Sequence, residues 1–481
     1  SFSNVKDLRK SVTPELQHKN STLVHIWMHD DELRMGGSAL YQTQKLYGGV
    51  TPDIDDPENL KSLFNTAQDL LNSSLISAMH DISDGGLVTS LIEMSLCSSI
   101  GLDIRMDISS KEKLIPSLFA EEAGLVIEVQ NENLAKVKEV LKNSNLSYAD
   151  VAKTTDKQAV NIFHFNETVF SDTLQNLFNA WSDVSYKVQR LRDNIETAES
   201  ERKTNQEFQK FLTPDIKFNI PPAQKNLFGK KPKIALLREQ GINGHYDMAA
   251  ALMAAGFEVH DVHMSQIATK IKNFDEYSGL VIPGGFSYGD VLGAGSGMSN
   301  TILFNQEINS IFSEFLNNDR KFALGICNGC QFMSGLKALI PGGESMPKFV
   351  KNFSNQYECR LVQLQLQDSK SILFKGMEGS TIPVMVSHGE GRAVFDQNEK
   401  NVVARYVDPN HKSTETYPFN PNGSLNGVAG VCNDDGRITI MMPHPERTFL
   451  TKQFSWAPKD WGELSPWFKM FDNAYLFSKK N

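Results

Sequence analysis

Apolar and polar residues alternate along the first part of the chain in two different periods. Period-two alternation is typical of strands, and apolar residues three and four apart are typical of one helix face. The predicted strands are Leu23–Met28, Gly101–Met106, Gly124–Val129 and Ala159–Phe165, and Ile76–Leu87 is expected to be a strand that runs into a loop and then a helix. A helix is expected over Asn59–Leu75, with an apolar face of Leu60, Leu63, Phe64, Ala67, Leu70 and Leu71. Further helices are expected at about 112–122, 132–144 and 172–192. Interleaved strands and helices predict a layered α/β domain.

A new pattern of short, nearly continuous apolar runs begins at Lys233. They predict strands at Ile234–Leu237, Phe257–Val262, Gly279–Pro283 and Phe322–Leu324. A helix is expected over His245–Ala255, because Gly256 follows it as a stop signal. Fully apolar strands alternating with helices favour a parallel sheet that is covered on both faces. In such folds the reactive loops follow the carboxyl ends of the strands.

Between these two patterns the periodicity weakens over residues 193–232. Charged and polar residues dominate there, and four prolines interrupt the stretch: Pro214, Pro221, Pro222 and Pro232. Such a composition is typical of a domain boundary. The sequence therefore predicts a first domain over 1–192, a linker over 193–232 and a second domain over 233–481.

Composition narrows the class of protein. Apolar residues make up 40% and charged residues 22% of the chain, as in an ordinary globular protein. The net charge is -9 and lysine and arginine form no dense patch, so we expect no nucleic-acid partner. No apolar run is long enough to span a membrane, so no membrane partner is expected either. Five cysteines, an odd and sparse set, fit a reducing, cytoplasmic location. Because the sequence starts at Ser1, we expect it to be a piece of a longer protein.

The stretch after the strand at Phe322–Leu324 carries the strongest chemical signal. Cys327 has glycine two residues away on each side, at Gly325 and Gly329, and an apolar helical pattern follows. A nucleophile between glycines at a strand-to-helix turn is the arrangement of a nucleophile elbow. The helix start behind it favours the thiolate form of the cysteine. Cys327 is therefore a candidate nucleophile.

Cys327 and Cys330 also have the two-residue gap of a redox pair or of half a zinc site. A structural zinc site needs further closely spaced cysteines or histidines. The other cysteines, Cys97, Cys359 and Cys432, are scattered singly. Zinc is therefore disfavoured, while a redox pair and a buried core cysteine remain open on spacing alone.

A base for this cysteine is found near the end of the chain, where His444 and Glu446 follow a strand-like run at Ile438–Met442. Extended backbone would point both side chains to one side, so that Glu446 can orient the imidazole. In isolation such a pair is more often a surface ion pair than a catalytic one.

Taken with the elbow, the order Cys, then His-x-Glu resembles the triad of class I glutamine amidotransferases. Further motifs resemble one family within this class, the phosphoribosylformylglycinamidine synthases of the large single-chain type. The motifs that carry the resemblance are Leu237–Asn243, Gly284–Asp290, Ser387–Arg392, Tyr417–Ser424 and Pro443–Arg447. In the first half, His80–Leu87 resembles the same family's ATP-dependent synthetase domain. The resemblance runs over almost the whole chain, but the first half matches only the last portion of that synthetase domain.

The resemblance implies a role for each matching residue. Cys327 would attack the glutamine side chain and form a thioester, His444 would carry the proton, and Glu446 would orient His444. The backbone amides of Gly285 and Asn328 would form an oxyanion hole. A further residue, Gln331, matches a glutamine-binding position of the family.

In the first half, the resemblance implies that Asp81 holds magnesium and that Ser83 contacts the nucleotide phosphate. Mg²⁺ and ATP are then the expected cofactors, and glutamine and formylglycinamide ribonucleotide the substrates. From spacing alone this loop could equally be a helix start, with Ser83 or Asp84 as the N-cap.

The sequence therefore raises three candidate functions. The chain is expected to be the ammonia-supplying part of a formylglycinamidine synthase. A degenerate amidotransferase that serves only as a docking module is disfavoured, because Cys327, His444 and Glu446 are all present. A cysteine hydrolase or protease is disfavoured by the His-x-Glu order and by the synthetase-like loop at Asp81.

Overall fold

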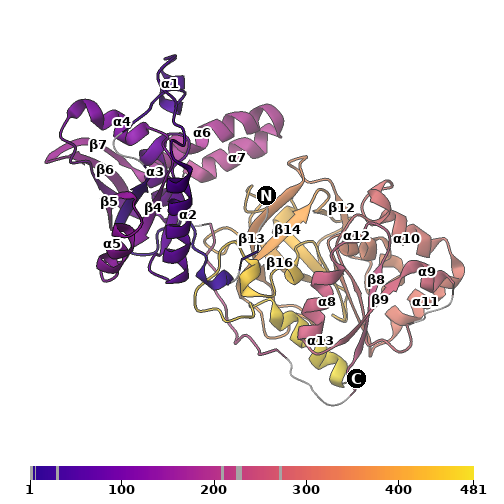
Figure 1. The fold of residues 1–481 in the computed structure, drawn as a ribbon. Coiled ribbons are helices and arrows are strands. Elements are labelled where there is room, and N and C mark those ends of the chain that lie inside the picture. Colours follow the sequence, from indigo (N-terminus) through magenta and orange to yellow (C-terminus); the bar gives the residue numbers. More distant parts are fainter. Residues whose placement is uncertain are drawn as a thin grey trace. The chain divides into compact units, whose positions relative to one another are not determined.

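The structure, a computed structural model, describes residues 4–5, 7–28, 32–206, 211–223, 230–269 and 274–480. The described chain forms two compact units (Figure 1). The first contains the described residues up to Ser185 together with Gln206. The second contains Tyr186–Asn205 and the described residues from 211 onward. Both are built of sheets and helices, so the predicted α/β class is confirmed.

The first unit has a seven-stranded sheet of order β2-β4-β1-β5-β3-β6-β7. Neighbouring strands are antiparallel except for β3 and β6, which are parallel. The strands are β1 (Thr22–Trp27), β2 (Ala78–Asp81), β3 (Gly101–Arg105), β4 (Gly124–Val129), β5 (Ser147–Thr155), β6 (Ala159–His164) and β7 (Glu167–Thr173). The helices are α1 (Ala39–Thr43), α2 (Pro57–Asn72), α3 (Gly86–Ser98), α4 (Leu114–Phe119), α5 (Leu134–Lys142) and the first part of α6 (Leu174–Arg192).

Apolar side chains cover both faces of this sheet. On β1, Leu23 belongs to one buried cluster, while Val24 and Ile26 belong to a second cluster. Neighbouring side chains of a strand point to opposite faces, so the two clusters lie on opposite sides of the sheet. Helices α3 and α4 contribute to the cluster of Leu23, and helices α2 and α5 to the other. The unit is therefore a three-layer α/β/α arrangement.

Helix α2 buries a narrower face than predicted. Leu63, Ala67 and Leu70 are buried, but Leu60 and Phe64 are exposed. Positions i, i+4 and i+7 form the buried stripe, and Leu71 beside it is partly buried against the same cluster. Of the predicted apolar face, Leu60 and Phe64 were therefore wrongly assigned.

Two strands of this sheet are absent from the sequence predictions, β5 and β7. β7 is the edge strand, and six of its seven residues are exposed, so it has no apolar alternation. β5 carries polar or half-buried side chains through its first half. Strands that lack a buried face leave no period-two signal.

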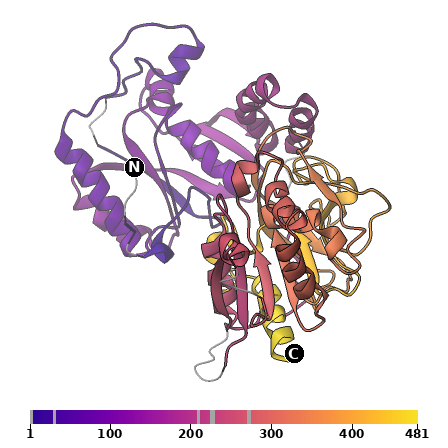
Figure 2. The ribbon, with the colours of Figure 1, turned by 90° about the vertical axis from the view of Figure 1, so that its right-hand side faces the viewer.

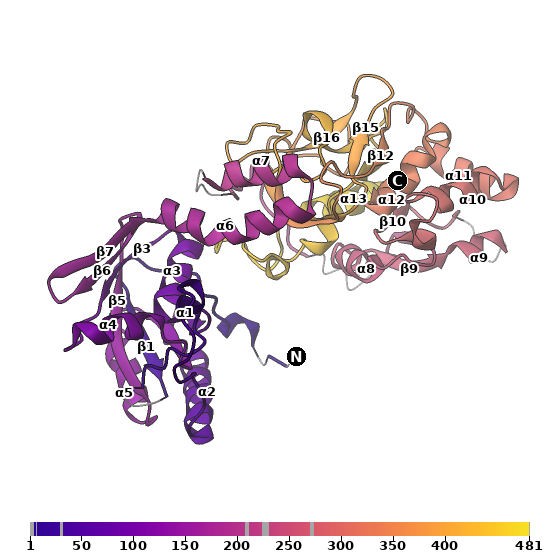
Figure 3. The same ribbon diagram turned by 90° about the horizontal axis from the view of Figure 1, so that it is seen from above.

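The predicted linker contains a helix, α7 (Ile195–Gln206). It runs back along the last turns of α6 (Figure 3), and Arg190 pairs with Glu199 at 2.9 Å between the two helices. Thr197, Ala198 and Thr204 are buried. The helix has a weak apolar pattern, which explains why sequence periodicity missed it. Parts of the predicted linker, 207–210 and 224–229, lie outside the described residues.

The second unit has a nine-stranded sheet of order β14-β13-β16-β17-β18-β11-β10-β8-β9. The strands are β8 (Lys233–Arg238), β9 (Glu258–His263), β10 (Gly279–Ile282), β11 (Phe322–Ile326), β13 (Glu358–Leu366), β14 (Thr381–His388), β16 (Val402–Tyr406), β17 (Val428–Cys432) and β18 (Ile438–Met441). From β9 to β18 every pairing is parallel, as predicted. From β18 to β14 every pairing is antiparallel, an extension that the sequence did not predict.

Helices cover the parallel part of this sheet. Helices α8 (His245–Ala254) and α13 (Phe468–Lys480) lie side by side, although they are far apart in sequence (Figures 1 and 2). A second group, α10 (Ser296–Leu303), α11 (Gln306–Asn317) and α12 (Asn328–Gly335), packs together, with α12 against β10, β11 and β18. Strands β11 and β18 are parallel neighbours, so the loops after their carboxyl ends meet at one edge of the sheet.

Candidate active site

Cys327 occupies the sharp turn between β11 and α12. Its backbone has φ 53° and ψ -109°, a conformation that non-glycine residues rarely adopt. The turn brings neighbouring backbone very close: a Cβ on Gly325 would lie 2.5 Å from the Gly329 carbonyl oxygen, and one on Gly329 would lie 2.0 Å from that of Ile282. Only glycine fits at these two positions. The geometry is that of a nucleophile elbow, as the spacing predicted.

His444 and Glu446 lie after β18, the neighbour of the strand that carries Cys327. His444 Nδ1 is 2.6 Å from Glu446 Oε1, and both side chains are buried. The backbone is not extended here, because Pro445–Arg447 form a turn of 3-10 helix. The predicted contact therefore exists, but the geometry given for it was wrong.

The surroundings of His444 favour its charged form. Burial disfavours the imidazolium, but the Glu446 carboxylate and the Cys327 sulfur outweigh burial and raise the pKa of His444 to about 10. The other ring nitrogen, Nε2, has no hydrogen-bond partner of ordinary geometry. An imidazole oriented through Nδ1 and open at Nε2 is the arrangement that a cysteine nucleophile needs.

Cys330 does not behave as the partner of a redox pair. Its side chain is fully buried, and burial raises the pKa of its thiol well above the ordinary value. All five cysteines are free thiols. Within the described ranges, no group of three or more His, Cys, Asp or Glu side chains is placed to hold a metal ion. Cys330 is therefore a core residue, and of the two cysteines only Cys327 occupies the turn of the nucleophile elbow.

A cavity of about 280 Å³ lies beside Cys327 and His444. Its wall contains Asn243, Gly285, Phe286, Asp290, Ala294, Gln331, Tyr357, Ser387, His388, Gly389, Glu390 and Arg447. Gln331 is 8% exposed and donates from Nε2 to the Glu390 carbonyl oxygen at 2.6 Å. Asn328 begins helix α12, so its N–H has no acceptor within the helix. Cys327, His444, Gly285 and Gln331 thus share one cavity, and Asn328 directly follows the cysteine.

The side chain of Asn328 ties the start of α12 to the loop after β10. Its Oδ1 accepts from the Ser287 hydroxyl at 2.7 Å, and its Nδ2 donates to Asp290 Oδ1 at 2.9 Å. Burial raises the pKa of Asp290. Ser287 and Asp290 lie within a motif that the sequence singled out, but spacing gave no role for either.

In the first unit, Asp81 is the last residue of β2, and Ser83 lies in the loop that follows. Asp81 is 71% exposed at its side chain, with Oδ1 3.2 Å from His80 Nδ1. The N-cap of helix α3 is instead Gly85, which has φ 88° and no side chain to cap the helix. The helix-cap role considered for Ser83 or Asp84 is therefore wrong. Glu121 accepts from the Gly85 N–H at 2.8 Å and holds this end of the loop.

An exposed carboxylate followed by a hydroxyl fits magnesium only in part. Mg²⁺ is held by one or two protein carboxylates when phosphate oxygens and water supply its other ligands. Asp81 and Ser83 are thus suited to a magnesium ion that arrives with a nucleotide.

In the part of the chain that the structure describes, no helix is long and apolar enough to cross a membrane.

Residues 231–478, which include the elbow, the His-x-Glu turn and the cavity, match the CobB/CobQ-like glutamine amidotransferase domain family. This match spans more than half of the chain. The protein is a glutamine amidotransferase of this family. Residues 26–164 match the C-terminal domain of AIR synthase related proteins. The predicted combination of an amidotransferase part with a synthetase-related part is therefore confirmed.

Solved structures similar to this amidotransferase include PurLQS from Thermotoga maritima, with 26% identity and a TM-score of 0.40. That match covers 52% of this chain and 99% of the other. PurL of T. maritima complexed with ATP is 14% identical, with a TM-score of 0.30 over 35% of this chain. The same protein complexed with FGAR is 15% identical, also with a TM-score of 0.30. The amidotransferase chain spans about 27% of the PurL chain in the ATP complex.

Proposed function

We propose that this amidotransferase releases ammonia from glutamine with Cys327 as nucleophile, as the ammonia-supplying part of a phosphoribosylformylglycinamidine synthase. The observation that carries the proposal is the buried His444–Glu446 pair next to the strained Cys327, at the carboxyl ends of two adjacent strands. The two matching families, an amidotransferase and an AIR synthase related domain, support the pairing of glutamine hydrolysis with a synthetase.

In the proposed first step, the Cys327 sulfur attacks the side-chain amide carbon of glutamine. His444 keeps the cysteine as thiolate and then donates its Nε2 proton to the departing nitrogen, which leaves as ammonia. A γ-glutamyl thioester remains on Cys327. Water, deprotonated by His444, then attacks the thioester and releases glutamate. Glu446 holds the imidazole through Nδ1 and stabilises its positive charge in both steps.

Both steps pass through a tetrahedral species with a negatively charged oxygen. The backbone amides of Gly285 and Asn328 are proposed to donate to this oxygen. The partial positive charge at the start of helix α12 adds to this stabilisation. Gln331, whose side chain is fixed on the Glu390 carbonyl, is proposed to bind glutamine.

The proposed reaction of the whole enzyme joins the released ammonia to formylglycinamide ribonucleotide, with ATP converted to ADP and phosphate. Asp81 would hold a magnesium ion together with nucleotide phosphate, and the Ser83 hydroxyl would donate to the phosphate. Magnesium bound there would neutralise phosphate charge during the transfer.

The deciding experiment measures glutamine hydrolysis by Cys327→Ala, with Cys330→Ser as the matched control. Cys327→Ala is expected to release no glutamate and to form no acid-stable γ-glutamyl adduct, while Cys330→Ser keeps both. In a synthase that contains all parts needed to make formylglycinamidine ribonucleotide, the Cys327→Ala variant should still form this product from added ammonia. Glutamate release by Cys327→Ala at the wild-type rate would refute the proposal, and equal loss in both variants would restore the redox-pair interpretation.

A further inference from the structure

The loop after β10 carries Gly285, a proposed oxyanion donor, and three residues later a tyrosine with an unusual backbone. Tyr288 has φ 53° and ψ 30°, in the left-handed region that residues with a side chain rarely adopt. Such a conformation persists only where the surrounding structure holds it in place. The contacts of Tyr288 therefore bear on the position of Gly285.

The side chain of Tyr288 is held at two points. Its hydroxyl donates to Glu239 Oε2 at 2.9 Å. Its ring packs against Gly297 of α10, where a Cβ would lie 2.8 Å from the ring atom Cδ2. Burial, followed by the contact with Glu239, raises the pKa of Tyr288. The hydroxyl therefore keeps its proton near neutral pH and remains a donor to Glu239.

The carboxylate of Glu239 is itself fixed by the ends of two strands. Glu239 directly follows β8 and is 6% exposed. Its Oε1 accepts from the Gln240 N–H at 2.8 Å and lies 3.1 Å from Nε2 of His263, the last residue of β9. The Ser265 N–H donates to His263 Nδ1 at 3.2 Å, so a neutral ring carries its proton on Nε2. His263 therefore donates to Glu239 whether its ring is neutral or charged, and Oε2 is left for Tyr288.

Backbone hydrogen bonds join the segment after β8 to the loop after β10. The Phe286 N–H donates to the Gly241 carbonyl oxygen at 2.8 Å, and the Tyr288 N–H donates to that of Gln240 at 3.0 Å. The two segments lie so close that a Cβ on Gly241 would come within 2.0 Å of the Phe286 carbonyl oxygen. The segment that begins with Glu239 thus holds Tyr288 by its backbone and by its side chain.

We propose that Glu239 is a positioning residue for the oxyanion hole, which holds the backbone amide of Gly285 in place through Tyr288. This inference rests on the proposed glutamine hydrolysis. Neither Glu239 nor Tyr288 belongs to the described wall of the cavity, so neither is expected to touch glutamine. Donors of an oxyanion hole act on the charge that develops in the transition state. Loss of the contact between Glu239 and Tyr288 should therefore lower kcat and leave the binding of glutamine unchanged.

Two substitutions break this contact from opposite sides. Glu239→Ala removes the acceptor, and Tyr288→Phe removes only the hydroxyl. Each is expected to lower kcat for glutamine hydrolysis roughly 10- to 100-fold, with KM within about threefold of the wild-type value. Because both act through one hydrogen bond, the double variant should lose at most about threefold more than the weaker of the two enzymes. A kcat of Tyr288→Phe within about threefold of wild type overturns the proposal, as do losses that multiply in the double variant.

Matched controls lie at the amino ends of neighbouring strands. Tyr277→Phe, just before β10, removes a hydroxyl that lies 3.1 Å from His260 Nδ1. Glu258→Ala, at the start of β9, removes a carboxylate whose Oε1 lies 2.7 Å from His260 Nε2. Both variants remove the same kinds of group far from the loop after β10, and both should hydrolyse glutamine like the wild type. Equal losses in Tyr277→Phe and Tyr288→Phe would overturn the proposal.

A further measurement separates lost alignment from a general disturbance of the site. Glutamate γ-semialdehyde is an aldehyde analogue of glutamine. The Cys327 thiolate adds to the aldehyde carbon, and the carbonyl electrons move to the oxygen, which then requires the oxyanion hole. Tyr288→Phe should weaken inhibition by this aldehyde roughly 10- to 100-fold. The rate at which iodoacetamide alkylates Cys327 should stay at the wild-type value, since the cysteine and its base are unchanged.

Binding of the substrate itself provides the comparison. The Kd for glutamine is measured in Cys327→Ala, with and without Tyr288→Phe, and should be the same in both. Equal weakening of glutamine and of the aldehyde would overturn the proposal, because a misaligned oxyanion hole affects only the tetrahedral species. Failure of the wild-type chain to hydrolyse glutamine would instead contradict the proposed function.

Discussion

Glu446 Oε1 lies 2.6 Å from His444 Nδ1, and both side chains are sealed from solvent. A buried carboxylate in contact with an imidazole makes stability depend on pH, because the folded protein holds a proton that the unfolded chain gives up more easily.

The folded-state pKa of His444 is about 10, against about 6.5 in an unfolded chain. The stabilisation from its charged form is therefore complete below about pH 6.5 and is lost as the pH rises through about 10. Glu446→Gln removes the carboxylate, so it should lose most of this dependence. Thermal unfolding at several values between pH 6 and pH 10 measures it. If the unfolding free energies of the wild type and of Glu446→Gln changed in parallel with pH, the Glu446 carboxylate would not be stabilising a charged His444.

Gly329→Ala should disable the elbow. The added Cβ would lie 2.0 Å from the Ile282 carbonyl oxygen, which is backbone and cannot move aside. The expected result is a loss of several kcal/mol in unfolding free energy or of glutamine hydrolysis, since overpacked sites cost about 1–3 kcal/mol or more. Gly462→Ala is the control, because a Cβ there meets nothing within 4 Å. Normal activity and stability in Gly329→Ala would show that the backbone at residue 329 does not approach the Ile282 carbonyl oxygen so closely.

Glu128 is expected to stabilise the first unit. Its buried carboxylate accepts from the backbone N–H groups of Gln17 and His18, at 2.8 and 3.0 Å, and from the Ser21 hydroxyl at 2.7 Å. Glu128→Ala leaves these donors unpaired and should lower the unfolding free energy by about 1–3 kcal/mol for each group left buried. Chemical denaturation of the chain measures the loss. The exposed Glu132 is the comparison site, and Glu132→Ala should change stability by less than about 0.5 kcal/mol.

Asp81→Asn tests the magnesium role. The substitution keeps the size of the side chain but removes one negative charge from an exposed position, so stability should be unchanged. Magnesium-dependent nucleotide binding and ATP-dependent synthesis should fall, while glutamine hydrolysis at Cys327 continues. Asp84→Asn, in the same loop, should have little effect. Equal metal dependence in wild type and Asp81→Asn would remove Asp81 from the site.

The parts of the fold that the sequence predicted are those in which local pattern and tertiary position agree. The short apolar run at Phe322–Leu324 and the glycines beside Cys327 predicted the strand and the elbow, because each needs only neighbouring residues. His444 was predicted because a nucleophile of this kind requires a base at the end of a nearby strand. The strands β13, β14, β16 and β17 were not predicted, since their pairing depends on partners distant in the chain.

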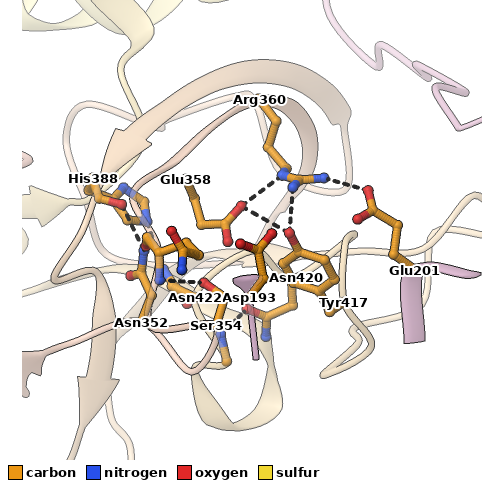
Figure 4. Close-up of polar contacts among 12 residues, drawn as sticks. Asp193, Glu201, Asn352, Ser354, Glu358, Arg360, His388, Tyr417, Asn420 and Asn422 are labelled. Carbon is orange, nitrogen blue, oxygen red and sulfur yellow. Dashed lines mark hydrogen bonds and ion pairs between the residues drawn. The ribbon is translucent and has the colours of Figure 1, made fainter. Parts of the chain in front are cut away.

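Long-range polar contacts were equally hidden. His388 and Asn422 are 34 residues apart in the sequence, yet Asn422 Nδ2 lies 3.2 Å from His388 Nε2 (Figure 4). Nothing in the spacing of the two motifs indicates such a contact. The Glu446 contact was predicted for the wrong reason, because two prolines close a tight turn where an extended strand was expected. Composition and period describe which face of an element is buried, but not which donor meets which acceptor.

The tie between Asn328 and the loop after β10 has a mechanical consequence. Ser287 and Asp290 hydrogen-bond to the oxygen and the nitrogen of the Asn328 side-chain amide, and Asn328 is the residue next to the nucleophile. Gly285, two residues before Ser287, is therefore coupled to the start of α12 before any substrate is present. Under the proposed roles, the two amides that receive the oxyanion are a single preorganised part, and little rearrangement is needed when charge develops. A change at Ser287 or Asp290 would then slow the chemistry through lost alignment, without touching the substrate.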